Sequence, residues 1–416
     1  MTVALLFSGY GAYYFCRSDL SVAMPLFVDQ LEKLGLSHAS ALVRAGSIAS
    51  YGVLAYAIGK FLLTGLADLW GGRRNFLAGL GGAVVCTVIF AFGGALPVFT
   101  LAWVGNRLIQ SMGWAGLVKV SSRWFSYSAY GTVLGILSLS FLIGDAAARQ
   151  SMGILLEWGY GLRGIFLFAA GVAVIVLAAN ALWLRGTRTE LGFSEPEFSP
   201  LSVASAPQDT DHPTWRAILT PLLSNRAFWV VCALSLGCTI VRETFNLWTP
   251  LYLATYVGFG QAAGARMSSV FPAVGAVSVL LMGWLSDRLG KYGRSIMMFF
   301  GLSAAAGGLI ALTGIRAGAV SYLPVILIGV VAFSLLGPYS YLAGAMALDF
   351  GGRRAGAASS GIIDGVGYLG GVLAGDSVAR VSIRYGWQGV FWSLAAISAA
   401  SALAAAYLFF HQRSGR

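Results

Sequence analysis

Three polar residues near the start of the chain are spaced so that they share one face of a helix. Tyr10, Tyr14 and Arg17 stand at positions i, i+4 and i+7 of an apolar stretch, SGYGAYYFCRSDLSVAMPLF. An arginine in the middle of such a stretch costs about 2.5–3.5 kcal/mol on membrane-insertion scales, so it needs a partner or a function. Its guanidinium stays charged and can bind two oxygens of one phosphate. The pattern predicts an anion-binding site made of Arg17 and the two tyrosine hydroxyls.

A second arginine, Arg242, lies at a similar depth in a later apolar stretch, within VRETFNLWTP (241–250). Two arginines that face each other across a two-fold axis would neutralise a dianion held between two halves. The alternative for Arg17 is a structural pair with Asp19 or a carbonyl, although Asp19 is only two residues away and points to a different face. Glu243 is an alternative partner for Arg242.

The composition identifies the class of protein in which these residues act. The 416 residues are 57% hydrophobic and 10% charged, with a mean hydropathy of +0.76. A soluble chain has about 25% charged residues, so an integral membrane protein is predicted. The net charge of +11 lies mostly in short loops and indicates topology, and no zinc or RNA-binding motif points to a nucleic-acid partner. The four cysteines lie in apolar stretches and are expected to be free thiols.

Twelve apolar stretches are long enough to cross a bilayer, six before and six after a polar linker. The expected fold is therefore an all-α membrane protein with two pseudo-symmetric six-helix bundles, residues 1–185 and 226–416, joined by a cytoplasmic linker at 186–225. The expected spans are 2–27, 42–66, 75–93, 97–120, 131–155, 164–185, 226–256, 265–286, 294–313, 321–349, 355–380 and 389–410.

Loop charges predict the orientation. Loops after the even-numbered spans, with the linker and the C-terminal tail, have the larger share of Lys and Arg, which places them and both termini in the cytoplasm. Compact loops favour a bacterial inner membrane.

The two halves also share a turn. TGLADLWGGRR (64–74) follows the second span, and GWLSDRLGKYGR (283–294) follows the eighth. Repeated halves with a binding site between them are typical of secondary transporters. We expect the charged residues of these turns to hold one side of the protein closed; they are Asp68, Arg73, Arg74, Asp287, Arg288 and Arg294.

These features resemble the major facilitator superfamily over the whole chain, and within it the organophosphate:phosphate antiporter family. The strings that carry the family resemblance are GYGAYYFCRSDLSVAMP (9–25), SYGVLAYAIGKFLLTGLAD (50–68), QSMGW (110–114) and VRETFNLWTP. The resemblance implies a monomer that exchanges an organic phosphate for inorganic phosphate. It also implies six substrate-binding residues, which fall on Arg17, Arg242, Lys60, Tyr10, Tyr14 and Tyr56.

The chain departs from the family pattern in several places. A histidine used by glycerol-3-phosphate members falls on Phe141, and Arg107 is similar to a fourth-helix arginine of proton-coupled facilitators. A buried carboxylate without a partner would protonate, as in a proton relay, but it could equally balance a nearby arginine. The residues that could couple transport to protons, or only balance charge, are Asp19, Arg107, Asp145, Glu243 and Asp364.

Transport of a sugar phosphate or glycerol phosphate in exchange for phosphate, by alternating access, is the leading hypothesis. The first alternative is a proton-coupled symporter of another organic anion, a carboxylate or a phosphonate, and the second is a sugar-phosphate sensor with the transporter fold. The sequence contains no P-loop, nucleophile–base set or metal cluster, so no enzyme activity, cofactor or metal is expected.

Overall fold

The computed structural model describes residues 1–63, 66–192, 194, 220, 222–289 and 292–413. Its contacts divide the chain into two compact units. The first comprises residues 1–19, 55–148 and 160–212, and the second comprises 20–54, 149–159 and 213–416. Most of the predicted linker, 186–225, lies outside the described residues, so the division into bundles at 185 and 226 stays a prediction.

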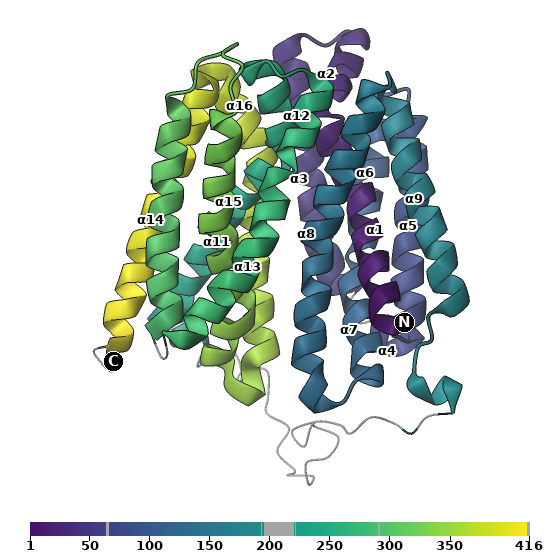
Figure 1. Cartoon of the computed structure of the whole chain (residues 1–416), viewed down its shortest axis with the longest axis vertical. Helices are drawn as coiled ribbons and strands as arrows, with labels where there is room; N and C mark the ends of the chain where they lie inside the picture. Colours follow the sequence, from purple (N-terminus) through teal and green to yellow (C-terminus); the bar gives the residue numbers. More distant parts are fainter. Residues whose placement is uncertain (64–65, 193, 195–219, 221, 290–291, 414–416) are drawn as a thin grey trace. The chain divides into compact units, whose positions relative to one another are not determined.

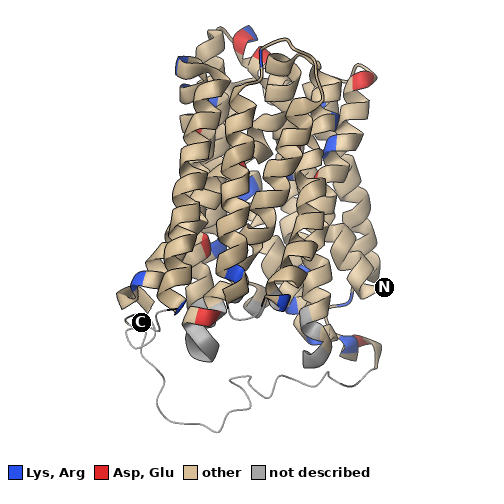
Figure 2. Ribbon diagram, turned by 60° about the vertical axis from the view of Figure 1, so that its left-hand side comes forward, with Lys and Arg blue, Asp and Glu red and all other residues tan. Residues whose placement is uncertain are grey.

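The described chain is almost entirely helical, as expected for a backbone that must satisfy its own hydrogen bonds in lipid. Nine of its helical segments are long and apolar enough to cross a membrane, and Figure 2 shows long stretches of helix without Lys, Arg, Asp or Glu. The all-α membrane class predicted from composition is confirmed.

The first unit contains most of the early helices. Within it, α5 packs against α6, α7 and α9, and α4 packs against α5 and α7. The helices are α1 (Thr2–Val22, to Asp19), α3 (His38–Leu62, from Ala55), α4 (Leu66–Trp70), α5 (Gly72–Ala91), α6 (Leu96–Gln110), α7 (Met112–Trp124), α8 (Tyr127–Glu157, to Ala148), α9 (Leu162–Trp183) and the short η1 (Arg188–Leu191).

The second unit contains the remaining helices, of which α13, α14 and α15 run beside one another (Figure 1). The α11 helix packs against α16, and so does α14. The helices are α2 (Met24–Lys33), the start of α3, the end of α8, α11 (Arg226–Leu251), η2 (Tyr252–Val257), α12 (Gln261–Ser268), α13 (Val270–Arg288), α14 (Gly293–Thr313), α15 (Leu323–Tyr341), η4 (Leu342–Met346) and α16 (Ala347–Arg413).

Prolines mark where predicted spans change geometry. Pro25 stands in the first turn of α2, where the missing N–H is harmless. Pro250 and Pro338 lie inside α11 and α15, and each of these helices continues as a π-helix, η2 or η4. Because proline cannot donate to the carbonyl four residues earlier, each leaves a backbone acceptor that must find another partner.

The last two predicted spans, 355–380 and 389–410, fall within one assigned helix, α16. A straight helix of 67 residues would be about 100 Å long, far more than the roughly 30 Å of a hydrocarbon core. Gly386 interrupts it with a φ of 68°, a left-handed conformation that glycine adopts without a Cβ clash. The break therefore lies between the two predicted spans.

Small residues bring α3 and α16 together in the second unit. Gly46 and Gly375 face each other so closely that a Cβ on Gly46 would lie 2.8 Å from the Gly375 carbonyl oxygen. Beside them, the Ser50 hydroxyl donates to the Val372 carbonyl at 2.6 Å and accepts from the Asp376 N–H at 3.0 Å. In lipid the hydrophobic effect does not drive helices to associate. Van der Waals contacts and hydrogen bonds of this kind hold them together instead.

Gly375→Ala is expected to lower the thermal unfolding temperature, because its methyl group would meet the Gly46 carbonyl and Ser50. Overpacking of this kind costs about 1–3 kcal/mol. Gly307→Ala in α14 is the matched control, since nothing lies within 4 Å of its added Cβ. The control should be neutral or gain up to about 1 kcal/mol from helix propensity. Tryptophan fluorescence of the purified protein during heating measures both, and equal unfolding temperatures would contradict the packing assignment.

Candidate functional site

The predicted polar face of α1 is present in the first unit. The ring centroids of Tyr10 and Tyr14 are 5.9 Å apart in an edge arrangement, and the guanidinium carbon of Arg17 lies 5.1 Å from the Tyr14 centroid. An arginine over a tyrosine ring is attracted by the negative face of the π-system. The spacing i, i+4, i+7 therefore places the three side chains in one row, as the sequence predicted.

Tyr56 on α3 is the residue around which the cations of this unit gather. Its ring centroid lies 4.6 Å from the Arg17 guanidinium carbon, 5.0 Å from that of Arg107 and 5.5 Å from the Lys60 ammonium nitrogen. Tyr56 is buried, with 3% of its surface exposed. Three helices, α1, α3 and α6, thus bring three positive charges to one phenol ring. We call Arg17, Lys60, Arg107 and Tyr56 the cation cluster.

Arg107 is the unexpected member of the cation cluster. The sequence placed it with residues for coupling or charge balance, by similarity to another kind of facilitator. In the structure it is buried, with 3% of its surface exposed, and it shares the Tyr56 ring with Arg17. Its position on α6, far from α1 and α3 in sequence, gave no signal of that proximity.

Neighbouring aromatic and amide groups fix the cluster in place. Tyr10 packs against Trp114 at 5.3 Å, and Tyr14 packs against Phe141 at 5.6 Å between ring centroids. Gln110, three residues beyond Arg107, donates from Nε2 to the Cys16 carbonyl at 2.9 Å. That bond fixes the position of α6 against the turn of α1 that ends in Arg17.

Two of the acidic residues expected to serve in coupling or charge balance are buried in the first unit. Asp19 has no exposed surface, and Asp145 has 5%. The Ser18 hydroxyl donates to Asp145 Oδ1 at 2.5 Å, which ties α8 to α1.

Arg242 belongs to the second unit and has a counter-ion there. Its Nη2 lies 2.5 Å from Glu243 Oε1, and both side chains are nearly buried, 12% and 11% exposed. The guanidinium carbon also lies 4.5 Å from the Tyr339 ring centroid. Glu243 is thus the partner of Arg242 in this structure, the alternative that the sequence left open. Asp364, on α16, is partly buried.

The predicted gating residues are only partly described. Arg73 donates from Nη2 to the Ala181 carbonyl at 2.6 Å, and Arg74 is exposed. Arg288 stacks on Trp284, with its guanidinium carbon 3.9 Å from the ring centroid, and Arg294 forms an ion pair with Asp349 at 2.6 Å. The side chains of Asp68 and Asp287 lie outside the described residues, so their gating role stays a prediction.

A further arginine of these helices, the buried Arg149 on α8, satisfies a backbone group that Pro250 leaves open in the second unit. Pro250 has no N–H to donate to the Asn246 carbonyl. Arg149 Nη2 donates to that oxygen at 2.8 Å, and the Ser21 hydroxyl donates to it at 2.6 Å. The Leu247 carbonyl lies 2.9 Å from the same hydroxyl, whose single proton the two carbonyls share. The proline was visible in the sequence, whereas the residues that replace its N–H were not.

This network sits one turn from Arg242. Asn246 lies four residues after Arg242, and its side-chain amide is 3.5 Å from Glu243 Oε1. Arg149, with 2% of its surface exposed, therefore supports the part of α11 that carries the arginine–glutamate pair.

The chemistry available here is anion binding. Guanidinium and ammonium groups have N–H donors suited to an oxyanion, and tyrosine hydroxyls can donate as well. Within the described part of the chain, no group of three or more His, Cys, Asp or Glu is placed to hold a metal ion.

The chain belongs to the Major Facilitator Superfamily, whose family model matches residues 6–375. A solved structure supports the same fold: a bacterial homologue of the human lysosomal transporter Spinster, in an inward-facing and unoccupied conformation. Its TM-score is 0.75 at 14% identity, and the match covers 99% of this chain and 96% of that one.

Relatives of similar length have been named for phosphorylated substrates. A probable hexose phosphate transport protein of Chlamydia trachomatis is 28% identical over 94% of this chain and 86% of its own length. A glycerol-3-phosphate transporter of Haemophilus influenzae is 25% identical over 93% of this chain and 86% of its own length.

Arg149→Gln is expected to cost more stability when it is made in the wild-type protein than when it is made in the Pro250→Ala variant. Alanine at 250 restores an N–H for the Asn246 carbonyl, so part of what Arg149 contributes becomes redundant. The difference should be about 0.5–1.5 kcal/mol, the net value of one hydrogen bond. Thermal unfolding of the four proteins of the cycle measures it.

Ser268→Ala is the control for this cycle. Ser268 accepts from Arg149 Nη1 at 3.2 Å and does not contact the Asn246 carbonyl, so its cost should be equal in both backgrounds. If Arg149→Gln also costs the same stability in wild type and in Pro250→Ala, then Arg149 does not satisfy the Asn246 carbonyl.

Proposed function

We propose that this protein is a secondary active transporter that exchanges a phosphorylated organic anion, a sugar phosphate or glycerol phosphate, for inorganic phosphate. The observation that carries the proposal is the cation cluster, in which Arg17, Lys60 and Arg107 surround the buried Tyr56 ring. The names of the relatives, hexose phosphate and glycerol-3-phosphate transporters, point to the same class of substrate.

In this proposal Arg17 and Arg242 are the main ligands of the phosphoryl group. A guanidinium fork binds two phosphate oxygens at once, which an ammonium cannot do. Lys60 adds charge from the next turn after Tyr56, and the hydroxyls of Tyr10 and Tyr14 donate from the face of α1 that carries Arg17. The protein binds and releases its ligand without changing it, so no catalytic residue is assigned.

The contacts of Arg17 and Arg242 support binding that is strong enough for selection and weak enough for release. Arg17 rests on ring faces, and Arg242 rests on Glu243 and Tyr339. An entering dianion has to compete with Glu243 for Arg242, which lowers the net gain. A carrier whose cations are not neutralised by an anion would reorient poorly, so the release of one anion would be coupled to the return of another.

We place the protein in a bacterial inner membrane as a monomer, with both termini in the cytoplasm. The support is the excess of Lys and Arg in the loops on the side of the linker.

The Arg242–Glu243 pair also favours a second function, proton-coupled symport of an organic anion. If a proton neutralised Glu243 when the substrate bound, Arg242 would be released to the anion and a proton would travel with it. Uptake driven by a pH gradient, without internal phosphate, separates this alternative from exchange.

Arg17→Lys and Arg242→Lys are each expected to lower phosphate exchange at least about 100-fold, because lysine keeps the charge but loses the bidentate fork. The measurement is counterflow of labelled phosphate into proteoliposomes loaded with phosphate, glycerol-3-phosphate or glucose-6-phosphate.

Arg384→Lys serves as the control, since Arg384 is exposed and stacks only on Tyr385 among the rings described. Wild-type activity in both lysine variants would refute the assignment of the arginines. Absence of exchange with every phosphate, together with uptake of other anions under a proton gradient, would favour the symporter. Ligand binding without flux of any kind would favour a sensor.

A further inference from the structure

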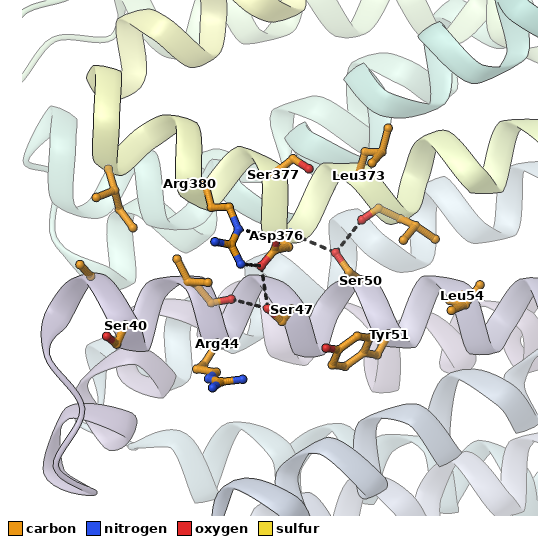
Figure 3. A pocket seen from close by; sticks show the side chains of 14 residues that line it. Ser40, Arg44, Ser47, Ser50, Tyr51, Leu54, Leu373, Asp376, Ser377 and Arg380 are labelled. Carbon is orange, nitrogen blue, oxygen red and sulfur yellow. Dashed lines mark hydrogen bonds and ion pairs between the residues drawn. The ribbon is translucent and has the colours of Figure 1, made fainter.

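A groove in the second unit lies between the first half of α3 and the part of α16 before Gly386. Its volume is about 780 Å³. Figure 3 shows its lining, in which both helices contribute side chains. The lining residues that give the groove its charge and its apolar surface are Arg44, Tyr51, Leu54, Leu373, Asp376 and Arg380.

The groove is on the opposite side of α3 from the proposed substrate residues. Ser47, which lines the groove, and Tyr56 are nine residues apart, which turns the helix by about 900° and leaves their side chains about 180° apart. The exposed residues on the groove side of α3 are apolar beyond Arg44. Tyr51 is 50% exposed and Leu54 is 39% exposed, and Ile58 continues the stripe at 44%. Such an apolar stripe on a membrane-spanning helix is a surface that an acyl chain can contact.

The groove is polar at one end and apolar at the other. Gly46 faces Gly375 and Ser50 contacts Val372, so residue numbers rise along α3 as they fall along α16 and the helices are antiparallel. Arg44 and Arg380 therefore lie at the same end. Leu54 and Leu373, the latter 49% exposed, lie toward the other end.

The polar end has a net positive charge. Arg380 donates to Asp376 Oδ2 at 2.7 Å and Oδ1 at 3.2 Å, and Ser47 donates to Oδ1 at 2.8 Å, so this aspartate is already engaged (Figure 3). Arg44 forms no hydrogen bond or ion pair with any described residue, and it is exposed. Two arginines against one aspartate leave a charge of +1.

The depth of Arg44 limits what can neutralise it. It lies six residues after the start of α3 at His38, or about 9 Å along the helix axis. A cation inside a membrane-spanning segment reaches toward the polar headgroups and is stabilised by anionic ones. A groove with a cationic end and an apolar continuation matches the shape of a phospholipid.

We propose that this groove binds an anionic phospholipid, with the headgroup phosphate on Arg44 and Arg380 and one acyl chain along Tyr51, Leu54 and Leu373. The lipid bridges α3 and α16 on the side of α3 away from Tyr56. Zwitterionic lipids would be bound less well, because Asp376 is engaged by Arg380 and Ser47 and leaves no anionic partner for a choline or ethanolamine group.

The test is native mass spectrometry of the full-length protein, titrated with phosphatidylglycerol or phosphatidylcholine of the same acyl chains. Wild type should bind phosphatidylglycerol more tightly. Arg44→Gln should weaken that binding about tenfold, the change that corresponds to losing one charge-assisted hydrogen bond. It should weaken phosphatidylcholine binding less, because the choline of that lipid already neutralises its phosphate. Arg44→Lys should retain most of the preference because it keeps the charge.

Arg384→Gln removes the same charge from α16 four residues beyond Arg380, outside the groove lining. It should bind phosphatidylglycerol as wild type does. Equal binding of the two lipids by wild type would overturn the proposal. Equal losses of phosphatidylglycerol binding in Arg44→Gln and Arg384→Gln would also overturn it, because they would reflect the overall surface charge and not the groove.

Discussion

Polar groups inside a membrane helix have no water to bind, so each must find a partner within the protein or in a ligand. Much of this structure results from that requirement. Pro250 removes one N–H from α11, and the Asn246 carbonyl that it exposes is taken by Arg149 and Ser21. Ser50 bridges a donor and an acceptor of α16 in the same way. These bonds connect helices because the missing partner comes from a neighbouring element.

The arginines inside the membrane helices divide into two groups by the contacts described for them. Arg149 donates to a backbone carbonyl, which cannot leave, and this suits a residue that holds helices together. Arg17 and Arg107 lie on the ring of Tyr56, and Arg242 pairs with a glutamate beside a tyrosine. A ring face satisfies a guanidinium only partly, since its N–H groups can still donate in the ring plane. In the proposed function, an entering anion competes with these contacts.

The two charged regions of α3 have different surroundings, because each needs its own kind of partner inside the membrane. Tyr56 and Lys60 lie on a buried face, where charge is tolerated because aromatic rings and other polar groups surround it. Arg44 lies on the opposite, exposed side, near the end of the helix, where a headgroup can reach it. Successive residues of a helix are rotated by 100° about its axis, so its side chains point in different directions. One helix can thus contact two ligands of related chemistry on different faces.

The sequence by itself determined the class, the apolar spans and the face of α1 that carries Tyr10, Tyr14 and Arg17, because these depend on composition and on spacing within one helix. The prolines and Gly386 were equally visible, but what they do was not. Only the tertiary structure brought Arg107 to Tyr56 and Arg149 to the Asn246 carbonyl, and only it placed Arg44 and Arg380 at one end of a groove. Each of these depends on which helices are neighbours and on how they are rotated about their axes. Neighbours about 50 to 340 positions apart in the sequence leave no periodic signal in the chain, so packing alone decides them.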